Sequence, residues 1–75
     1  MNKYYTAESE KFQQNIRWHA CNAASLRSAK TIARRRKFFH STAVHVGVQS
    51  EDGIVRIASW YPAEDVQAGW NDWDI

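Results

Sequence analysis

Cysteine, proline and glycine are scarce in this chain of 75 residues, which has one, one and three of them. The single Cys21 excludes an intramolecular disulfide, and with three histidines it is too little for a cysteine-rich zinc site. Three glycines also leave no glycine-rich phosphate loop. No stretch approaches the roughly 18 apolar residues of a membrane span, and "MNKYYTAESE" lacks the pattern of a secretion signal. We therefore expect a cytoplasmic, non-membrane protein that uses no cofactor and no metal.

The short length also limits what the protein can do. We expect residues 1–75 to form one domain, because a chain of this size buries only about 60% of its unfolded surface. A deep cleft between two lobes is therefore not expected. His19, His40 and His45 match no metal-ligand spacing, and nothing around Cys21 resembles a nucleophile site. Structural roles are favoured for all four residues, and we expect a protein that is not an enzyme.

Alternating apolar and polar residues predict five strands. "MNKYYT" and "NIRWHAC" are the first two, with "AESEKFQQ" as a polar loop between them, and Ile16, Trp18 and Ala20 form the expected buried face of the second. "TAVHVGV" and "IVRIASWY" form a hairpin across the turn "SEDG". "WNDWDI" follows the loop "AEDVQAG" as a last strand, with Trp73 and Ile75 on one side. The predicted class is α+β, an antiparallel sheet of about five strands packed on one helix in the order β-β-α-β-β-β.

The predicted helix is amphipathic. Ser25 is a suitable N-cap, and at 100° per residue the apolar and basic side chains separate into two arcs. The apolar arc holds Leu26, Ala29, Ile32 and Ala33. The basic ridge holds Arg27, Lys30, Arg34 and Lys37. Small alanines on the apolar arc would let the helix lie close to a sheet, and the basic residues at its end complement the helix dipole.

The net charge of +2 combines two opposed blocks. Residues 27–37 contain six of the ten basic residues and no acid, whereas residues 38–75 contain Arg56 and six acids, which is a charge of −5. An uninterrupted run of cations repels itself, and a purely structural helix usually intersperses acids. The ridge is then either a solvated face or a surface that contacts phosphates or an acidic protein.

Two interpretations are also open for the aromatic residues and for the acids of the C-terminal half. Trp60, Tyr61 and Trp70 lie beside a proline-containing loop and are the tryptophans and tyrosine expected to be partly exposed. They either stack nucleic-acid bases or complete the core. Glu64 and Asp65 either face solvent or contact a basic surface of a partner.

The stretch "ASLRSAKTIARRRKFFHSTAVHV", followed by "EDG" and a tryptophan-containing tail, has the pattern "SLxxAKxxAxxxxxFxxT". With this pattern, residues 24–75 resemble small phage and mobile-element proteins, and more specifically anti-CRISPR inhibitors of the type I-F surveillance complex. The resemblance implies five antiparallel strands packed on one helix. It also implies that the helix binds the repeated backbone subunits of the complex where target DNA enters. The family's contact positions fall here on Lys30, Arg35 and Lys37, and a further basic contact falls on Thr31, which is uncharged.

Three functional hypotheses follow. The first is a non-enzymatic inhibitor that binds a CRISPR-Cas effector complex in the bacterial cytoplasm and blocks DNA binding. The second is a nucleic-acid-binding accessory protein of a phage or plasmid, which binds DNA or RNA without sequence preference. The third is a structural domain whose basic ridge only faces solvent. Under all three hypotheses we expect the protein to be a monomer or a weak dimer. The expected partner-binding residues are Arg27, Lys30, Thr31, Arg34, Arg35 and Lys37, with secondary contacts at Glu64, Asp65, Trp60 and Trp70.

Overall fold

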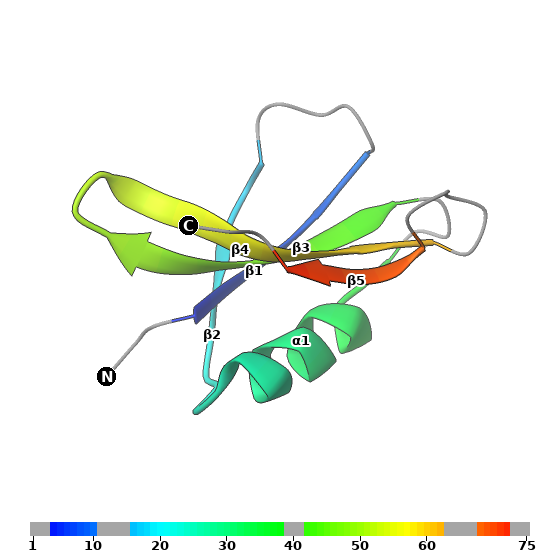
Figure 1. The fold of residues 1–75 in the computed structure, drawn as a ribbon, viewed down its shortest axis with the longest axis horizontal. Helices are drawn as coiled ribbons and strands as arrows, with labels where there is room; N and C mark the ends of the chain where they lie inside the picture. The colour runs from blue at the N-terminus through cyan, green and yellow to red at the C-terminus, as the bar shows by residue number, and fades with distance from the viewer. Residues whose placement is uncertain (1–3, 11–15, 39–41, 63–67, 73–75) are drawn as a thin grey trace.

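An antiparallel sheet carries helix α1 across one of its faces (Figure 1). The computed structural model describes residues 4–10, 16–38, 42–62 and 68–72. The strands lie in the order β2-β1-β3-β4-β5, and the predicted α+β class and element order are confirmed. The elements are β1 (Tyr4–Ser9), β2 (His19–Cys21), α1 (Leu26–Arg35), β3 (Ala43–Ser50), β4 (Gly53–Tyr61) and β5 (Gly69–Asp72).

Helix α1 begins where the sequence predicts. Ser25 has an extended backbone, and its hydroxyl accepts a hydrogen bond from the N–H of Ser28 at 3.2 Å, as an N-cap does. The helix ends at Arg35, with Arg36 as its C-cap. The predicted basic ridge is therefore too long, because Lys37 lies beyond the last helical turn.

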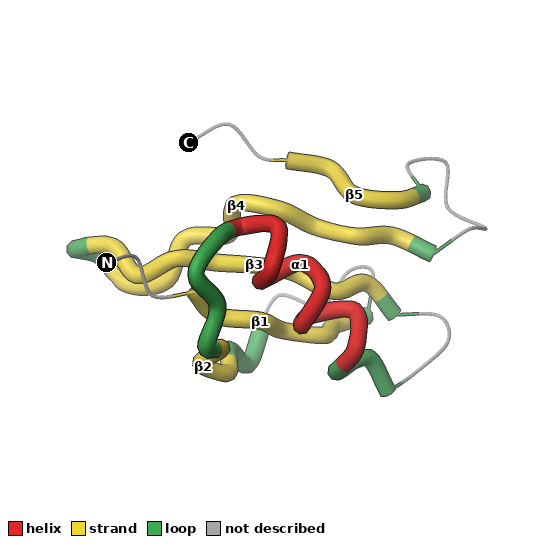
Figure 2. The backbone as a smooth tube through the Cα atoms, turned by 90° about the horizontal axis from the view of Figure 1, so that it is seen from below, coloured by secondary structure: helices red, strands yellow, loops and turns green. Residues whose placement is uncertain are grey.

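The core lies between α1 and the sheet. Ala29 and Ala33 are buried against Val44, Val46 and Ala58, and Figure 2 shows α1 running over β1 and β3. These alanines are 0% and 2% exposed, so the helix backbone approaches the strands closely. The predicted apolar arc is thus confirmed. Half-buried side chains that border this core include Tyr4, Leu26, Ile32, Ile57, Trp60 and Trp70.

Strand β1 extends further than the sequence predicts. Residues 7–9 were expected in a polar loop, but they continue β1 and pair with His45, Val44 and Ala43 of β3. Ala7 and Ser9 are both buried, on the face of the sheet opposite α1. A polar sequence forms a strand here because its side chains are enclosed by the tertiary structure.

Strand β2 is shorter than predicted, and its buried residue differs. Cys21 lies in the core at 6% exposure, whereas Ala20 is exposed, so the predicted buried face is wrong at Ala20. The alternating pattern fails because the chain joins the sheet only at His19. Trp18 instead packs on the face opposite α1, where its ring lies beside Gly47.

The last strand is confirmed over Gly69–Asp72, and the expected positions of Trp73 and Ile75 lie outside the described residues. This strand pairs with β4 through Trp60↔Trp70 and Ala58↔Asp72, which puts Trp70 and Asp72 on the face that carries α1. The edge strand β5 therefore forms one wall beside the helix.

Candidate docking surface on the helix

A groove lies between the outer side of α1 and the tryptophan of β5. It has a volume of about 490 Å³. Five of the six helix-region residues predicted to bind a partner line it, together with one of the two predicted tryptophans. The lining residues are Arg27, Lys30, Thr31, Arg34, Arg35 and Trp70.

Lys30 is held within the protein. Its ammonium lies 2.8 Å from a carboxylate oxygen of Asp72 and 5.4 Å from the centroid of the Trp70 ring. Its side chain is 22% exposed. Lys30 thus ties α1 to β5, and an acid of the C-terminal half compensates its charge.

Trp60 forms a platform under two cations. The guanidinium of Arg34 lies 4.0 Å from the centroid of the Trp60 ring, and the ammonium of Lys37 lies 5.8 Å from it. Cation–π contacts of this kind contribute about 0.5–1 kcal/mol each at exposed sites. Trp60 was expected as a secondary contact, and it is not among the residues that line the groove.

Arg27 and Arg35 supply the free positive charge of the groove. Both are exposed, and neither guanidinium has a hydrogen bond or ion pair within the described residues. Thr31 lies between them on the same side of the helix, and its hydroxyl donates to the backbone carbonyl of Arg27 at 3.2 Å. This uncharged, internally bonded side chain separates the two arginines.

Arg36 points to the opposite side of the helix. Its Nη1 donates to the hydroxyl of Thr6 at 3.2 Å and to the carbonyl oxygen of Ala20 at 3.1 Å. Nine residues separate Arg36 from Arg27, and at 100° per residue this places the two side chains half a turn apart. Arg36 is therefore not part of the groove, although it lies in the same run of cations.

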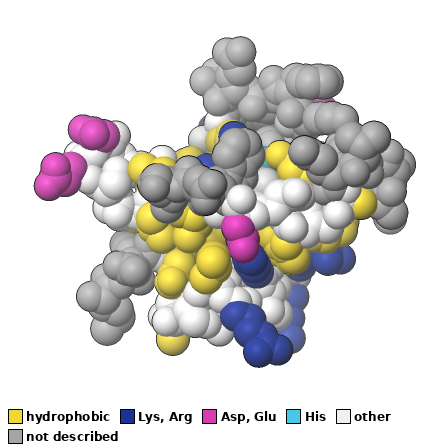
Figure 3. Space-filling model, in the orientation of Figure 1, with side chains coloured by type: hydrophobic (Ala, Val, Ile, Leu, Met, Phe, Trp, Pro, Cys, Tyr) yellow, Lys and Arg dark blue, Asp and Glu magenta, His cyan; other side chains and the backbone are white. Residues whose placement is uncertain are grey.

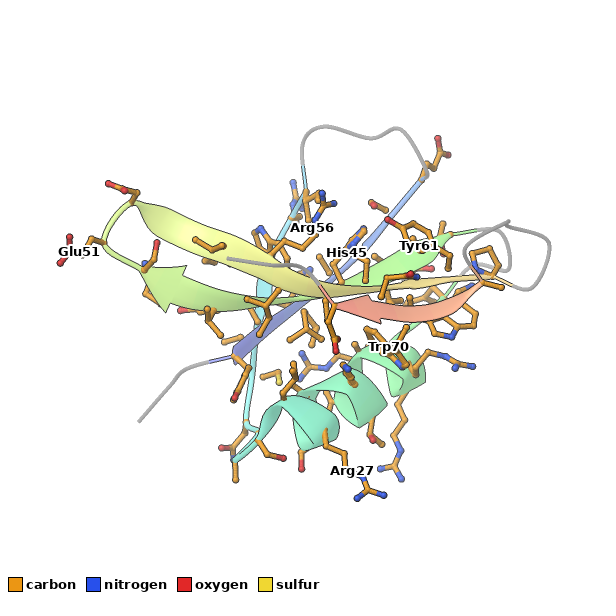
Figure 4. The ribbon with its side chains drawn as sticks, in the orientation of Figure 1. Arg27, His45, Glu51, Arg56, Tyr61 and Trp70 are labelled. Atoms are coloured by element: carbon orange, nitrogen blue, oxygen red, sulfur yellow. The ribbon has the colours of Figure 1, made fainter. Side chains whose placement is uncertain are left out.

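The acidic tip of the β3–β4 hairpin is separated in space from the basic residues of α1, although Asp72 of the same acidic block pairs with Lys30. Glu51 and Asp52 form the exposed tip of the β3–β4 hairpin, and Figure 4 shows Glu51 far from Arg27 on the outer side of α1. In Figure 3 two acidic side chains project at the upper left, whereas the largest basic side chains in view lie toward the lower right. The expected secondary contacts Glu64 and Asp65 lie outside the described residues.

His45 is structural. It lies on the face of the sheet opposite α1 at 3% exposure, with its ring nitrogens 2.6 Å from the Ser9 hydroxyl and 2.7 Å from the Ser59 hydroxyl. Burial, with a smaller effect of the nearby Arg56, lowers the pKa of His45 to about 4. A neutral imidazole fits this site because it can donate to one hydroxyl and accept from the other.

Cys21 is also enclosed. Its thiol is buried in the core, and burial raises the pKa above the ordinary cysteine value, against a smaller opposing effect of Arg36. Within the described ranges, no group of three His, Cys, Asp or Glu residues is arranged to hold a metal ion. The same part of the chain contains no helix with the length and apolar character that a membrane crossing needs.

Comparison of the chain with protein-family models, curated proteins and solved structures found no match. The function is therefore inferred from the groove itself.

One feature of this surface could not be predicted from the sequence, namely the Lys30–Asp72 ion pair, because it joins residues 42 positions apart. Arg36 was not predicted in the basic ridge, in agreement with the 3.6-residue period, which places it on the other side of the helix.

Proposed function

We propose that this protein is a non-enzymatic binding protein that docks the groove beside α1 onto an anionic surface of a macromolecular partner. The observation that carries the proposal is the convergence of Arg27, Arg34 and Arg35 with Trp70 on one surface. Arginine and tryptophan are the residue types that most often anchor interfaces. The acidic hairpin tip lies elsewhere and does not repel such a partner.

The partner that we propose is a CRISPR-Cas surveillance complex of type I-F. The support is the helix pattern "SLxxAKxxAxxxxxFxxT", whose basic positions in such inhibitors fall on Lys30, Arg35 and Lys37. In this chain Arg35 is exposed, whereas Lys30 and Lys37 contact Asp72 and Trp60. Docking by this surface would occlude the DNA path over the backbone subunits.

Few cations of the groove lack an acidic partner, and this small number favours a protein partner over duplex DNA. Lys30 is already paired with Asp72, and Thr31 contributes only a hydroxyl. Three arginines with a tryptophan suit a few acidic or polar pockets on a protein surface. A protein that neutralises three phosphates gains much less free energy from counterion release than one that contacts about 6–10.

Duplex DNA is the second candidate, because Arg27, Arg34 and Arg35 are cations without a neighbouring acid in the same helix. Three phosphate contacts would give a slope of about −2.7 in a plot of log K against log salt concentration. This slope distinguishes the DNA-binding function from protein docking.

The test is a binding assay with the purified type I-F surveillance complex in one arm and a duplex of random sequence in the other. The variants are Arg27→Glu and Arg35→Glu, singly and combined. The variant Asn22→Glu/Gln49→Glu is the matched control for one arginine-to-glutamate change, because it lowers the net charge by the same two units at exposed positions outside the groove. We expect Arg27→Glu/Arg35→Glu to lose complex binding by at least tenfold while the control retains it. Unchanged affinity of Arg27→Glu/Arg35→Glu would overturn the proposal, and binding to the duplex alone would replace it with the second candidate.

A further inference from the structure

A second hollow, with a volume of about 660 Å³, lies at the C-terminal end of α1 on the side away from the groove. Its size is within the range of small-ligand sites. Residues of β1, of the segment that leads into β2, of α1 and of the chain after α1 line it. The charged, polar and aromatic ones are Thr6, Glu8, Arg17, His19, Arg36 and Phe38.

The hollow exists because β2 is short. β2 pairs with β1 only from Tyr4↔Cys21 to Thr6↔His19. Before His19 the chain leaves β1, and the space beside Ala7 and Glu8 is open to Arg17 of the departing segment and to His19 at the start of β2. Segments that are far apart in the sequence thus meet around one space.

Arg36 is preoriented at this site. Both of its hydrogen bonds, to Thr6 and to Ala20, use Nη1. A guanidinium has five N–H donors, so Nη2 and Nε keep their donors for a ligand. An arginine fixed in this way presents a planar fork that matches carboxylate or phosphate oxygens.

The hollow has an excess of positive charge. Arg17 and His19 are exposed, and neither side chain has a hydrogen bond or ion pair within the part of the chain that the structure describes. Glu8, the acid among the described residues that line the hollow, is already engaged. Its carboxylate accepts from the N–H of Phe38 at 2.9 Å and from the hydroxyl of Thr42. Among the residues that the structure describes, the guanidiniums of Arg17 and Arg36 therefore have no carboxylate partner, and the site suits an anion.

Phe38 adds an aromatic surface to these cations. Its side chain is 87% exposed, while its backbone is anchored by the hydrogen bond to Glu8. A large apolar ring in this position adds almost no buried area to the core. A ring beside guanidiniums can instead stack an unpaired nucleic-acid base.

We propose that this hollow binds one nucleotide unit of a single-stranded nucleic acid. The phosphate would contact Arg17 and Arg36, and the base would stack on Phe38. A duplex does not satisfy the site, because its bases are stacked on one another and present only edges to a protein. The site lies on the other side of α1 from the groove, so it does not depend on the function proposed above.

The experiment measures fluorescence anisotropy of a labelled ten-nucleotide oligothymidylate with the full chain. Phe38→Ala and Arg17→Ala test the two halves of the site, and both side chains are exposed, so folding is expected to persist and circular dichroism checks it. Phe38→Ala should weaken binding between about fivefold and a hundredfold, the range of one base-stacking contact. Gln49→Glu is the matched control for Arg17→Ala, because it makes the same change of one unit of charge at an exposed position outside both the hollow and the groove, and it should have little effect.

Two results would overturn the proposal. One is an oligonucleotide affinity that neither Phe38→Ala nor Arg17→Ala changes. The other is competition by inorganic phosphate as effective as that by adenosine monophosphate, because a base that stacks on Phe38 must add to the affinity of the phosphate alone. Loss of binding to the surveillance complex in the groove variants, measured separately, would leave this site unaffected.

Discussion

Lys30 and Asp72 join the helix to the edge strand of the sheet, with 2.8 Å between Nζ and Oδ1. Lys30 also lies against Trp70, the β5 residue that lines the groove. The pair thereby sets the position of one wall of the groove relative to the other. Lys30, which was expected to contact a partner, therefore also braces the surface on which that contact would occur.

The substitution Asp72→Asn should distinguish the contribution of this ion pair to stability from its effect on partner binding. An ion pair of this exposure contributes about 0.2–1 kcal/mol, so the free energy of unfolding should fall by no more than that. At the same time the charge of Lys30 becomes uncompensated, and affinity for an anionic partner should rise. Urea unfolding and the binding assay measure the two effects. Asp52→Asn, at the hairpin tip, makes the same charge change and should alter neither the free energy of unfolding nor the partner affinity. A reduced partner affinity of Asp72→Asn would instead show that the Asp72 carboxylate itself contacts the partner.

The contact between Arg34 and Trp60 should be measurable as a coupling energy. A double-mutant cycle of Arg34→Ala and Trp60→Leu should give about 0.5–1 kcal/mol, because the guanidinium lies 4.0 Å from the ring centroid. Chemical denaturation of the four proteins in the cycle supplies the values. The same cycle with Arg35 in place of Arg34 is the control, and its coupling energy should be zero. Equal coupling energies in the two cycles would contradict the stacking of Arg34 on Trp60.

His45 should make stability depend on pH. The histidine pKa is about 6.5 in the unfolded chain, and burial lowers it to about 4 in the folded protein. The unfolded state therefore binds the proton more readily. Stability from the neutral imidazole is complete above pH 6.5 and falls as the pH decreases toward 4, by about 3 kcal/mol in total.

The measurement is urea unfolding at pH 7 and at pH 4.5, for the natural chain and for His45→Gln. The natural chain should lose more stability between these values than His45→Gln, in which this titration is absent. His19→Gln is the control, because His19 is exposed and should leave the pH dependence as it is. A pH dependence that His45→Gln does not reduce would show that other groups cause it.

Gly47 should not tolerate a side chain. A Cβ at this position would lie 2.7 Å from Cγ2 of Ile54 and 3.0 Å from the ring of Trp18. Gly47→Ala should therefore destabilise the protein by about 1–3 kcal/mol, the usual cost of overpacking. Thermal or urea unfolding measures it. In the double variant Gly47→Ala/Ile54→Ala the loss should be smaller than the sum of the two single losses, and strict additivity would refute the clash.

Much of the architecture can be read from local patterns. Ser25 caps the helix, Ala29 and Ala33 mark its buried side, and the alternation of Val44, Val46 and Val48 with polar or small residues marks β3. Period and capping depend on near neighbours in the chain, and near neighbours are what a sequence displays. The same patterns place Arg27, Lys30, Thr31, Arg34 and Arg35 on the outer side of the helix.

The sequence by itself determined the elements, their order and the basic side of α1, because each depends on residues a few positions apart. Only the tertiary structure decided which cations remain available. It pairs Lys30 with Asp72, stacks Arg34 on Trp60 and turns Arg36 toward Thr6. Each of these contacts joins segments separated by at least 26 residues. The strand pairing that brings such segments together depends on the packing of the whole sheet, so no local pattern specifies it.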